Sequence, residues 1–461
     1  MKVLVVNPPN EPYSEKSLLI EPIDVLGLAT YIKSLNHEVQ LIDMDVKQTS
    51  PETMVNTIKS FMPKITIIPF DYHIPLHTSA AIPNINKIGK IANFYGSKVI
   101  VGGKSSKYHP SEFLNYNIDV LINGEMEITI SELLNLEDWS LKNLAKVKEI
   151  SYNHEGTINT TEKRSDKIKV NSLPIPDRNL INMADYIDVR SMLSSRGCFG
   201  KCSFCPNTDF WGNWRGRSPE NVVDEIEYLV NEFDAKKILF LDDNATVNKD
   251  RMKNISDEII KRNIKTTLGC LGTVQTYDKE TIKKMQKAGF RWIHYGAESG
   301  NDKILYENSK NINSDQIKKA IIETKDAGLR VRTSWIFDLP GTDENAIQDT
   351  IDLILETEPE EIRAHYLALR AGTELYTRTF RGQSIPSQYI HNNQPSLNLS
   401  SYDHEKITEK VDELTNEFQN RGYLVITSPS EWRDVEKLKK IDPQLRFISF
   451  CPSRYGLGWE R

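Results

Sequence analysis

The sequence contains only five cysteines in 461 residues, and none of them precedes residue 198. Three of the five, Cys198, Cys202 and Cys205, fall within eight residues, while Cys270 and Cys451 stand alone. An odd number of thiols crowded into one segment argues against a disulfide-stabilised protein. Any thiol-bound metal centre must therefore depend on this one short segment.

Long apolar runs and an excess of basic charge are also missing. No stretch approaches the ~18 consecutive apolar residues of a membrane span, and the run Met1–Val6 is too short for a secretory signal. The formal net charge of −6 disfavours a broad nucleic-acid surface. With 39% hydrophobic and 26% charged residues, the composition is that of a globular protein of about two to four domains. We expect it in the cytoplasm, where thiols stay reduced.

The first ~140 residues alternate short β-rich runs with helical patterns, which is the rhythm of a parallel sheet. Strands are predicted at Lys2–Asn7, Glu38–Asp43, Lys64–Pro69, Lys98–Val101 and Asp119–Asn123. Helices are predicted at Ile23–Leu35, Pro51–Phe61, Ile85–Tyr95 and near Ile128–Leu136. These units predict a doubly wound, flavodoxin-like domain over residues 1–140, which binds ligands at the carboxyl edge of its strands.

Residues 141–185 break this rhythm, and we predict that they form a linker between domains. The runs Lys148–Tyr152 and Thr157–Thr161 flank His154-Glu-Gly156, which indicates a hairpin. The prolines of Leu173–Arg178 indicate an extended segment.

From about Asp188 the rhythm resumes with longer helices, over a predicted domain at residues 186–380. Strands are predicted at Asp188–Leu193, Lys237–Leu241, Lys265–Cys270, Trp292–Ala297, Arg330–Phe337 and Ile362–Leu369. Ser218-Pro219 is typical of a helix start, while Gly289 and Gly328 are typical of helix ends. The spacing predicts a partial (β/α)6 TIM-type barrel, whose chemistry lies on loops at the carboxyl ends of its strands.

Residues 381–461 are less regular, and we predict a small α-rich segment that caps the barrel or contacts substrate. A helix is expected from Asp403 to about Gly422. The aromatic and glycine-rich end, Phe447–Trp459, is expected to fold back on the protein. The fold class is therefore α/β throughout, with two α/β domains and this segment.

The cysteine spacing C-x3-C-x2-C supplies three soft ligands, with no fourth cysteine or histidine beside them. An iron–sulfur cube with one iron free of protein fits this set. A structural zinc ion requires four ligands; zinc and buried apolar thiols remain the alternatives. Because Cys198 follows the first predicted barrel strand directly, the cysteine loop is expected on the catalytic face of the barrel.

With this cysteine motif the chain resembles the radical S-adenosylmethionine superfamily, in particular its branch with an N-terminal cobalamin-binding domain. An aromatic residue, Phe204, precedes the last cysteine, as in the family's motif. Further sequence motifs typical of the family occur in the expected order at Arg215–Glu220, Phe240–Asp243, Tyr295–Ser299, Leu339–Thr342 and Ala371–Leu375. The resemblance covers roughly residues 1–380 and implies a [4Fe–4S] cluster that cleaves S-adenosylmethionine reductively.

The resemblance also implies roles for individual residues. The three cysteines would be the cluster ligands, and the backbone near Phe204 would meet the adenine. Asp242 and Asp243 would contact the methionine amino group; solvated loop carboxylates or helix N-caps are the alternative. Glu298 and Ser299 would meet the ribose or the carboxylate, unless they are structural.

For cobalamin, the resemblance points to Gly102 and Gly103 after the fourth strand, where backbone would approach the tetrapyrrole. A tight turn between strand and helix is the alternative. The Asp-x-His-x-x-Gly motif, which supplies an axial histidine in other cobalamin proteins, is missing after the first strand. His73 follows the third strand and is interpreted as a loop histidine. The domain could also have lost its cofactor.

The cysteine count separates the neighbouring families. Methylthiotransferases need a second cysteine trio in the N-terminal domain, and enzymes with auxiliary clusters need more thiols than Cys270 and Cys451 provide. Cys270 lies in a predicted strand and is interpreted as a core thiol. Cys451 is either an ordinary thiol or one that approaches the substrate or the cluster.

The resemblance implies cobalamin-dependent methylation of an unactivated centre in a small molecule or peptide, with flavodoxin or ferredoxin as electron donor. Alternatives are a radical rearrangement or cyclisation, aminocarboxypropyl transfer from S-adenosylmethionine, or a non-catalytic sensor of cobalamin or S-adenosylmethionine. Arg363, His365 and Arg370 are candidates to face an anionic substrate, although their alternation predicts that some of them point outward.

Overall fold

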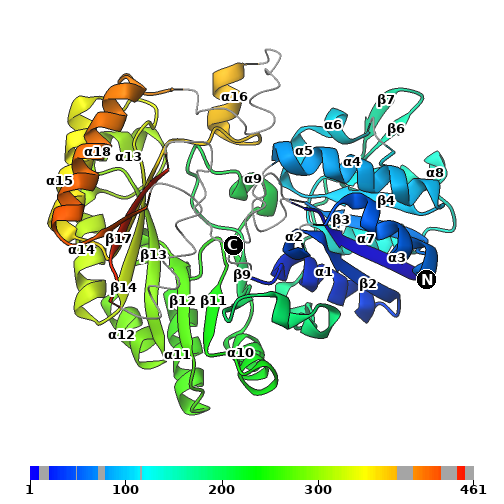
Figure 1. Ribbon diagram of the computed structural model, residues 1–461, viewed down its shortest axis with the longest axis horizontal. Helices are drawn as coiled ribbons and strands as arrows, with labels where there is room; N and C mark the ends of the chain where they lie inside the picture. Colours follow the sequence, from blue (N-terminus) through cyan, green and yellow to red (C-terminus); the bar gives the residue numbers. More distant parts are fainter. Residues whose placement is uncertain are drawn as a thin grey trace. The chain divides into compact units, whose positions relative to one another are not determined.

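The computed structural model describes residues 1–9, 20–47, 49–70, 78–114, 117–381, 398–426 and 444–451. These residues form two compact units, unit 1 ending at Ile187 and unit 2 beginning at Asp188 (Figure 1). Among the helices of these ranges, none combines the length and the apolar character needed to cross a membrane.

Unit 1 is built on a sheet of seven strands, whose order is β2-β1-β3-β4-β5-β6-β7. Its strands are β1 (Lys2–Asn7), β2 (Glu38–Asp43), β3 (Ile65–Pro69), β4 (Lys98–Gly102), β5 (Val120–Ile122), β6 (Ile150–His154) and β7 (Thr157–Thr160). The first five are parallel in the order 2-1-3-4-5, which is the flavodoxin-like order. The central strands are apolar on both sides because helices cover both faces.

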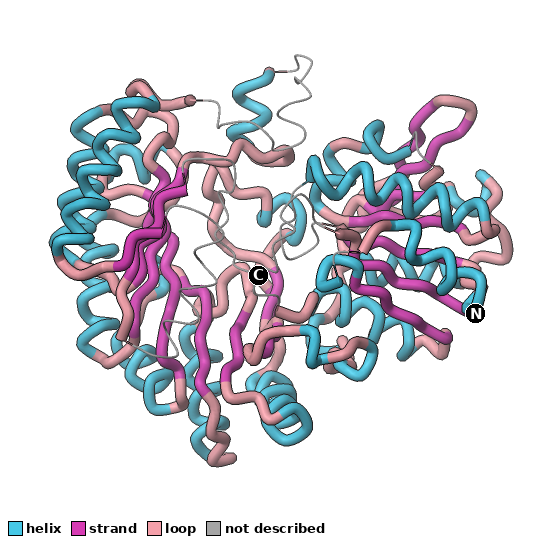
Figure 2. The backbone as a smooth tube through the Cα atoms, viewed as in Figure 1, coloured by secondary structure: helices cyan, strands magenta, loops and turns pink. Residues whose placement is uncertain are grey.

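The helices of unit 1 are α1 (Ile23–Ser34), α2 (Met44–Lys47), α3 (Met54–Phe61), α4 (Thr78–Phe94), α5 (Lys104–Tyr108), α6 (Pro110–Leu114), α7 (Met126–Leu134) and α8 (Leu141–Leu144). Figure 2 shows helices on both sides of the sheet. On one side, α3 and α4 pack on Leu4, Val6 and the equivalent residues of neighbouring strands. All residues of the core on this face of the sheet therefore belong to unit 1.

The structure differs from the predicted linker at residues 141–185, which is part of unit 1. β6 and β7 extend the sheet in antiparallel fashion from β5. Arg178 is fully buried with its Nε 3.8 Å from Glu21 Oε1, and Tyr186 donates a hydrogen bond of 2.7 Å to Asp43. The hairpin had a local signal in its turn, but its pairing with β5 and the burial of Arg178 had none.

Unit 2 contains a parallel sheet of eight strands in the order β16-β17-β15-β14-β13-β12-β11-β8. These are β8 (Arg190–Met192), β11 (Lys237–Phe240), β12 (Thr267–Gly272), β13 (Phe290–Glu298), β14 (Arg330–Ile336), β15 (Glu361–His365), β16 (Leu424–Ile426) and β17 (Phe447–Cys451). A small antiparallel pair, β9 (Ser195–Arg196) and β10 (Arg215–Gly216), stands apart from it. The six predicted barrel strands are all present, and β17 and β16 extend the sheet beyond β15.

The helices of unit 2 are α9 (Asn207–Trp211), α10 (Pro219–Phe233), α11 (Lys249–Lys261), α12 (Lys279–Lys287), α13 (Asp302–Glu307), α14 (Ser314–Asp326), α15 (Glu344–Thr357), α16 (Glu374–Phe380) and α18 (His404–Asn420). The long ones cover the outer face of the curved sheet (Figure 1). Alternate strand residues, such as Ile293, Val331 and Ile362, pack against them in one core. The remaining strand residues face the inside of the barrel.

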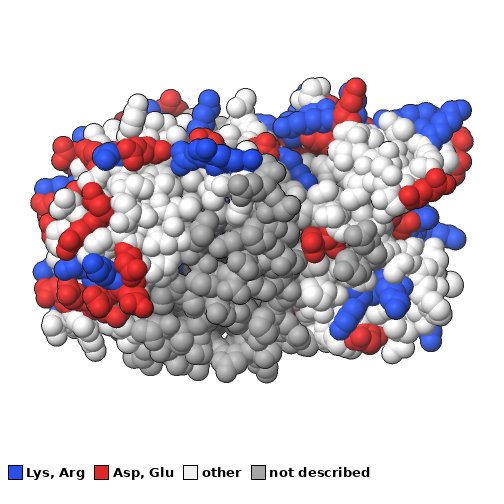
Figure 3. Space-filling model, turned by 90° about the horizontal axis from the view of Figure 1, so that it is seen from above, with Lys and Arg blue, Asp and Glu red and all other residues white. Residues whose placement is uncertain are grey.

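The C-terminal segment joins the barrel more closely than an α-rich cap would. Helix α18 corresponds to the predicted helix from Asp403. Its first residue, His404, contacts Tyr366 and Asp338 at the edge of the barrel. The His404 ring stacks on Tyr366 at 4.3 Å, and its Nε2 lies 3.0 Å from Asp338 Oδ2. The tail folds back as β17 up to Cys451, while residues 452–459 lie outside the described ranges. On the face drawn in Figure 3, acidic and basic side chains are interspersed over the described surface.

Candidate active site at the carboxyl end of the barrel strands

The three clustered cysteines lie in the loop between β9 and α9. This loop follows β8, an edge strand of the barrel sheet, and therefore lies at the carboxyl end of the strands. Cys198, Cys202 and Cys205 are free thiols of intermediate exposure. They are thus accessible to a bound group from the catalytic face of the fold.

Gly200 lies between the first two thiols. A Cβ atom at this position would be 3.5 Å from the Cys198 Sγ and 3.8 Å from the Cys202 Sγ. The Gly200 amide donates a hydrogen bond to the Cys198 Sγ (3.4 Å), and Asn244 Nδ2 donates a second one (3.7 Å). Hydrogen bonds to the ligand sulfurs are one means by which a protein tunes an iron–sulfur cluster. Asn244 is a site residue that no sequence motif indicated.

The protonation of the other two thiols shows what they need in order to bind metal. Burial raises the pKa of the Cys202 thiol, and it raises that of Cys205 to about 12. The charges of Cys202 and Asp243 raise the Cys205 pKa further. These thiols therefore favour the protonated form unless a cation compensates their charge. A metal centre supplies that cation, because a coordinating thiol is deprotonated.

No group of three or more His, Cys, Asp or Glu side chains within the described residues is arranged to hold a single metal ion. In an iron–sulfur cube each cysteine binds a different iron, so the three sulfurs do not need to converge on one atom. The Cys205 amide donates a hydrogen bond of 3.0 Å to the Cys202 carbonyl, which keeps these two ligands on one tight turn. The donor set therefore fits a cube with one open iron.

Asp242 lies under the start of the cysteine loop rather than at its surface. It is buried and accepts hydrogen bonds from the Ser194 amide (3.2 Å), the Ser194 hydroxyl (2.9 Å) and the Ser195 hydroxyl. Arg251 donates to the carbonyls of Ser194 and Arg217, both at 2.6 Å. Burial lowers the pKa of Arg251 to about 10, and the Asp242 charge opposes this change. Asp242 thus positions the loop through its serines.

Asp243 fixes both ends of the same loop. Its carboxylate accepts hydrogen bonds from the Gly197 amide (3.1 Å) and from Asn207 Nδ2 (2.6 Å), which flank the cysteine segment. Helix α11 is capped by Asn248 instead. Neither of the two alternatives from the sequence, a solvated carboxylate or a helix N-cap, therefore describes Asp242 or Asp243. A contact with the methionine amino group stays a prediction for both.

The turn that carries Phe204 is held by two distant segments. The Ser203 amide donates to the Asn308 carbonyl (3.1 Å), and the Ser203 hydroxyl lies 3.3 Å from Asn308 Oδ1. The Leu375 amide donates to the Ser203 carbonyl (2.9 Å). Phe204 itself is half-buried. The motif Ala371–Leu375 thus has a structural role, because its Leu375 amide anchors the cysteine loop.

Glu298 ends β13 and pairs with a residue that the sequence did not indicate. Its Oε1 lies 3.0 Å from Lys310 Nζ, and both side chains are largely buried. Its backbone is left-handed, with φ of 69°, which is rare for a residue with a side chain. Ser299 next to it is buried, lies 3.4 Å from the Thr350 hydroxyl and accepts the Asn301 amide. The structure thus brings Glu298, but not the Ser299 hydroxyl, to an ion pair beside the cysteine loop.

Polar side chains line the inner face of β13, β14 and β15. His294 Nε2 lies 2.7 Å from the Ser334 hydroxyl, and Arg332 pairs with Glu361 at 2.5 Å. Arg363 and His365 share the face of Glu361, opposite the core residues Ile362 and Ala364. Burial lowers the pKa of both His294 and His365.

Of the three candidates Arg363, His365 and Arg370, some of which were predicted to point outward, the two in the strand therefore do not. Residues 363 and 365 have the same parity, so they share the inner face. Arg370 lies beyond the end of β15, in the loop before α16, and is partly exposed. The inner face of the barrel thus carries two of the three predicted substrate contacts.

The cobalamin candidates of unit 1 lie at the carboxyl end of β4. Gly103 has a φ of 146°, which only glycine adopts readily, and it begins α5. A Cβ atom on Gly102 would be 2.7 Å from Met126 Cε, so a side chain of the protein occupies the space above it. Gly103 therefore fits a close backbone approach better than Gly102. His73 lies outside the described residues.

The two isolated cysteines differ in what the structure describes. Cys270 on β12 is fully buried in the core between sheet and helices, and burial raises the pKa of its thiol. It is thus a core thiol, as the sequence predicted. Cys451 is the last residue of β17 and pairs in register with His365, but its side chain lies outside the described part of the chain.

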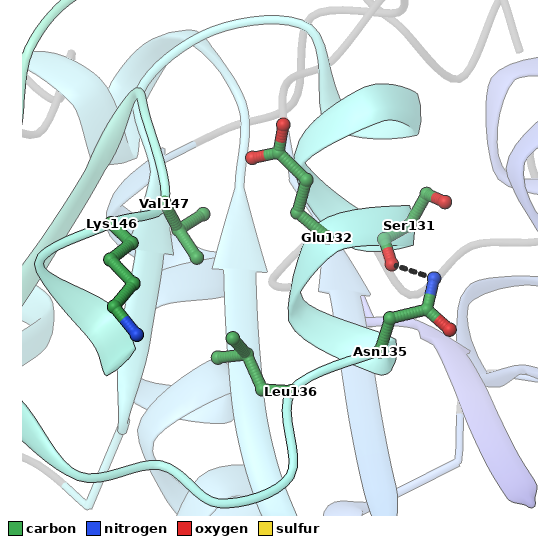
Figure 4. A pocket seen from close by; sticks show the side chains of 6 residues that line it. All are labelled: Ser131, Glu132, Asn135, Leu136, Lys146 and Val147. Atoms are coloured by element: carbon green, nitrogen blue, oxygen red, sulfur yellow. Dashed lines mark hydrogen bonds between the residues drawn. The ribbon is translucent and has the colours of Figure 1, made fainter. Parts of the chain in front are cut away.

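One pocket of unit 1 lies away from these residues. Because α7 starts at the carboxyl end of β5 and runs back, its last turn lies at the amino edge of the sheet. The pocket there is lined by Ser131, Glu132, Asn135, Leu136, Lys146 and Val147 (Figure 4). Asn135 already donates to the Ser131 carbonyl, and Glu132 pairs with Arg164. It shares no residue with the predicted ligand sites.

Comparisons with known proteins bear on the family of this domain and on the fold. Residues 192–354 match the radical SAM superfamily, so this part of unit 2 is a radical SAM domain. The chain is 28% identical over 362 residues to an uncharacterized methyltransferase of Pyrococcus horikoshii, which covers 76% of this chain and 77% of that protein. It is 22% identical over 400 residues to an anaerobic magnesium-protoporphyrin IX monomethyl ester cyclase of Synechocystis sp., covering 82% of this chain and 77% of that protein.

Among solved structures, the chain has the fold of TsrM from Kitasatospora setae, a radical S-adenosylmethionine methyltransferase solved with cobalamin and a [4Fe–4S] cluster bound. The TM-score is 0.72 at 16% identity, over 82% of this chain and 78% of that one. A coverage this large includes residues of both units. At this identity the likeness establishes the fold of the chain.

Proposed function

We propose that this chain, a radical SAM protein by its domain at residues 192–354, uses one [4Fe–4S] cluster to cleave S-adenosylmethionine reductively. The observation that carries this proposal is the cysteine loop. Its three thiols can bind three irons of a cube and leave the fourth open to a non-protein ligand. When bound, the cluster supplies the electron that breaks a carbon–sulfur bond.

The residues around the loop have three proposed roles. Cys198, Cys202 and Cys205 hold the cluster. The backbone near Phe204, with Glu298, contacts S-adenosylmethionine, and Ser299 supports Glu298 from its buried position. Asp242 and Asp243 are proposed near the methionine amino group; Asp242 acts through Ser194 and Ser195, which its carboxylate already binds.

We further propose that unit 1 binds cobalamin and that the reaction is methylation of an unactivated centre in a small molecule or peptide. The flavodoxin-like order of the first five strands, the backbone conformation of Gly103 and the similarity in fold to TsrM support this part. Gly103 is the residue where backbone would approach the corrin. Flavodoxin or ferredoxin is the proposed electron donor, in the cytoplasm.

The first experiment is anaerobic reconstitution with iron and sulfide, followed by incubation with S-adenosylmethionine, a reductant and hydroxocobalamin. Mass spectrometry then identifies the small-molecule products. We expect 5′-deoxyadenosine together with S-adenosylhomocysteine, and cobalamin that stays with the protein on gel filtration. The first product reports reductive cleavage, and the second reports transfer of the methyl group.

Other products would contradict parts of the proposal separately. Methylthioadenosine would indicate cleavage of a different carbon–sulfur bond and aminocarboxypropyl transfer. Formation of 5′-deoxyadenosine without retained cobalamin would remove the methylation and leave the radical chemistry. Retained cobalamin with no cleavage product at all would favour a sensor over an enzyme.

A second candidate function is ring closure. It is supported by the similarity over 82% of this chain to a protein named as a cyclase. Deuterium-labelled S-adenosylmethionine distinguishes the two functions, because methylation transfers the labelled methyl group to a product and cyclisation does not.

A further inference from the structure

The ion pair of Glu298 and Lys310 lies on the inner face of the barrel at the end of β13. Its two side chains are 12% and 14% exposed, so neither charge is well solvated. A Cβ atom on Gly296 would be 2.3 Å from Glu298 Oε1 and 3.2 Å from Lys310 Nζ. The pair therefore lies directly over the Gly296 backbone, and a side chain there would displace it.

The backbone on both sides of this pair is strained. Glu298, Ser309 and Asn311 all have left-handed φ angles, of 69°, 56° and 52°. This conformation is unfavourable for a residue with a side chain and persists only where its surroundings enforce it. Here the Asn311 carbonyl accepts Gln275 Nε2 (3.0 Å). Lys310 is thus presented by a strained loop that a second segment holds in place.

This loop contacts the cysteine loop directly. Asn308, two residues before Lys310, accepts the Ser203 amide between Cys202 and Cys205. Lys310 and Glu298 both lie close enough to Cys202 to interact electrostatically with its thiol, and their charges have opposite signs. Lys310 also lies within electrostatic range of Cys205, so the buried pair is near two of the three clustered thiols.

From this geometry we propose that Glu298 and Lys310 set the reduction potential of the iron–sulfur cluster, as a counterbalanced pair of buried charges. The inference rests on the proposed function, since it requires the cluster. Reduction adds one negative charge to the cluster, which a nearby cation stabilises and a nearby anion opposes. Lys310 therefore raises the reduction potential and Glu298 lowers it. With both charges present, the potential lies between the values expected with Lys310 alone and with Glu298 alone.

The test is a redox titration of the reconstituted cluster without S-adenosylmethionine, followed by electron paramagnetic resonance. At a fixed potential, we expect Lys310→Met to lower the ratio of reduced to oxidised cluster about tenfold, which is 59 mV for one electron. Glu298→Gln should raise the ratio by a similar factor. The double variant should return close to the wild type, and Lys310→Arg should stay there because the charge is kept.

Lys303 provides the matched control, since it is 73% exposed and 4.0 Å from Glu307 on α13. Lys303→Met should leave the ratio unchanged. Equal midpoint potentials in the wild type and Glu298→Gln would overturn the inference even if Lys310→Met failed to fold. A wild-type protein that binds no cluster would instead count against the proposed function. Shifts of the same sign in both single variants would indicate general loosening of the site and would also overturn the inference.

Discussion

Cys202 and Cys270 are both thiols of the barrel domain, but only Cys202 has a neighbouring thiol with which it could hold a metal centre. Cys202 shares the space around Gly200 with Cys198, whereas Cys270 is buried among apolar core residues. Cys202→Ala should therefore abolish the broad absorbance near roughly 400 nm and most of the iron of the reconstituted protein. Cys270→Ala should keep both, because it removes only a small core side chain.

Iron and sulfide analysis together with absorbance checks this contrast. Retention of about four irons per chain in Cys202→Ala would contradict the ligand assignment. Loss of iron in Cys270→Ala, with an unchanged melting temperature, would make that thiol a ligand and contradict its place in the core.

Residue-scale prediction from the sequence succeeded where the signal was local. The spacing of the three cysteines was sufficient to predict their common loop, because eight consecutive residues cannot separate far. Asn244 and Lys310 carried no such signal, since their partners Cys198 and Glu298 are remote in sequence or lie across a loop. Asp242 had a motif, but its burial under Ser194 and Ser195 depends on how the loop folds.

At the scale of the single element, the Ser218-Pro219 start of α10 is a separable source of stability. The Ser218 side chain accepts the Asn221 amide at 3.2 Å, which satisfies one of the unpaired donors of the first turn. Ser218→Ala should cost about 1 kcal/mol, whereas Ser218→Gly should cost only a few tenths. In differential scanning calorimetry this predicts a melting temperature of the barrel transition lower by roughly 2 °C for alanine.

Each variant is the control for the other. Both remove the side-chain oxygen, but alanine fits the backbone conformation of the N-cap position less well than glycine does. Equal losses would place the effect outside the cap. The cluster content should not change in either variant, since the loop is anchored through Asp243 and Asn308 instead.

Element boundaries followed from local patterns more often than element pairing did. The helix ends at Gly289 and Gly328 adopt the left-handed backbone that their sequence position indicated, with φ of 108° and 86°. The pairing of β17 with β15 and of β6 with β5 was not predicted, because each joins segments by a long or irregular connection. Propensity and period describe a strand, but its neighbour in the sheet is decided by tertiary packing.

At the scale of the whole molecule, the chain divides into two compact units, which makes the boundary near Ile187 and Asp188 testable. The core around Leu4, Val6 and α4 uses residues of unit 1 alone, and the core around β13 and β14 uses residues of unit 2 alone. A fragment of residues 1–187 should therefore fold by itself, because this core contains none of the residues of the barrel. Circular dichroism should show a cooperative melting transition for this fragment.

The same fragment separates the fold of unit 1 from its proposed ligand. If Gly103 marks a cobalamin site, the folded fragment should retain hydroxocobalamin on gel filtration, and Gly103→Val should lose it because φ of 146° is closed to valine. Gly156→Ala is the matched control, since this glycine also has a positive φ but lies in the β6–β7 turn with open space around it. A folded fragment that binds no cobalamin would make unit 1 a scaffold, whereas an unfolded one would contradict the independence of its core.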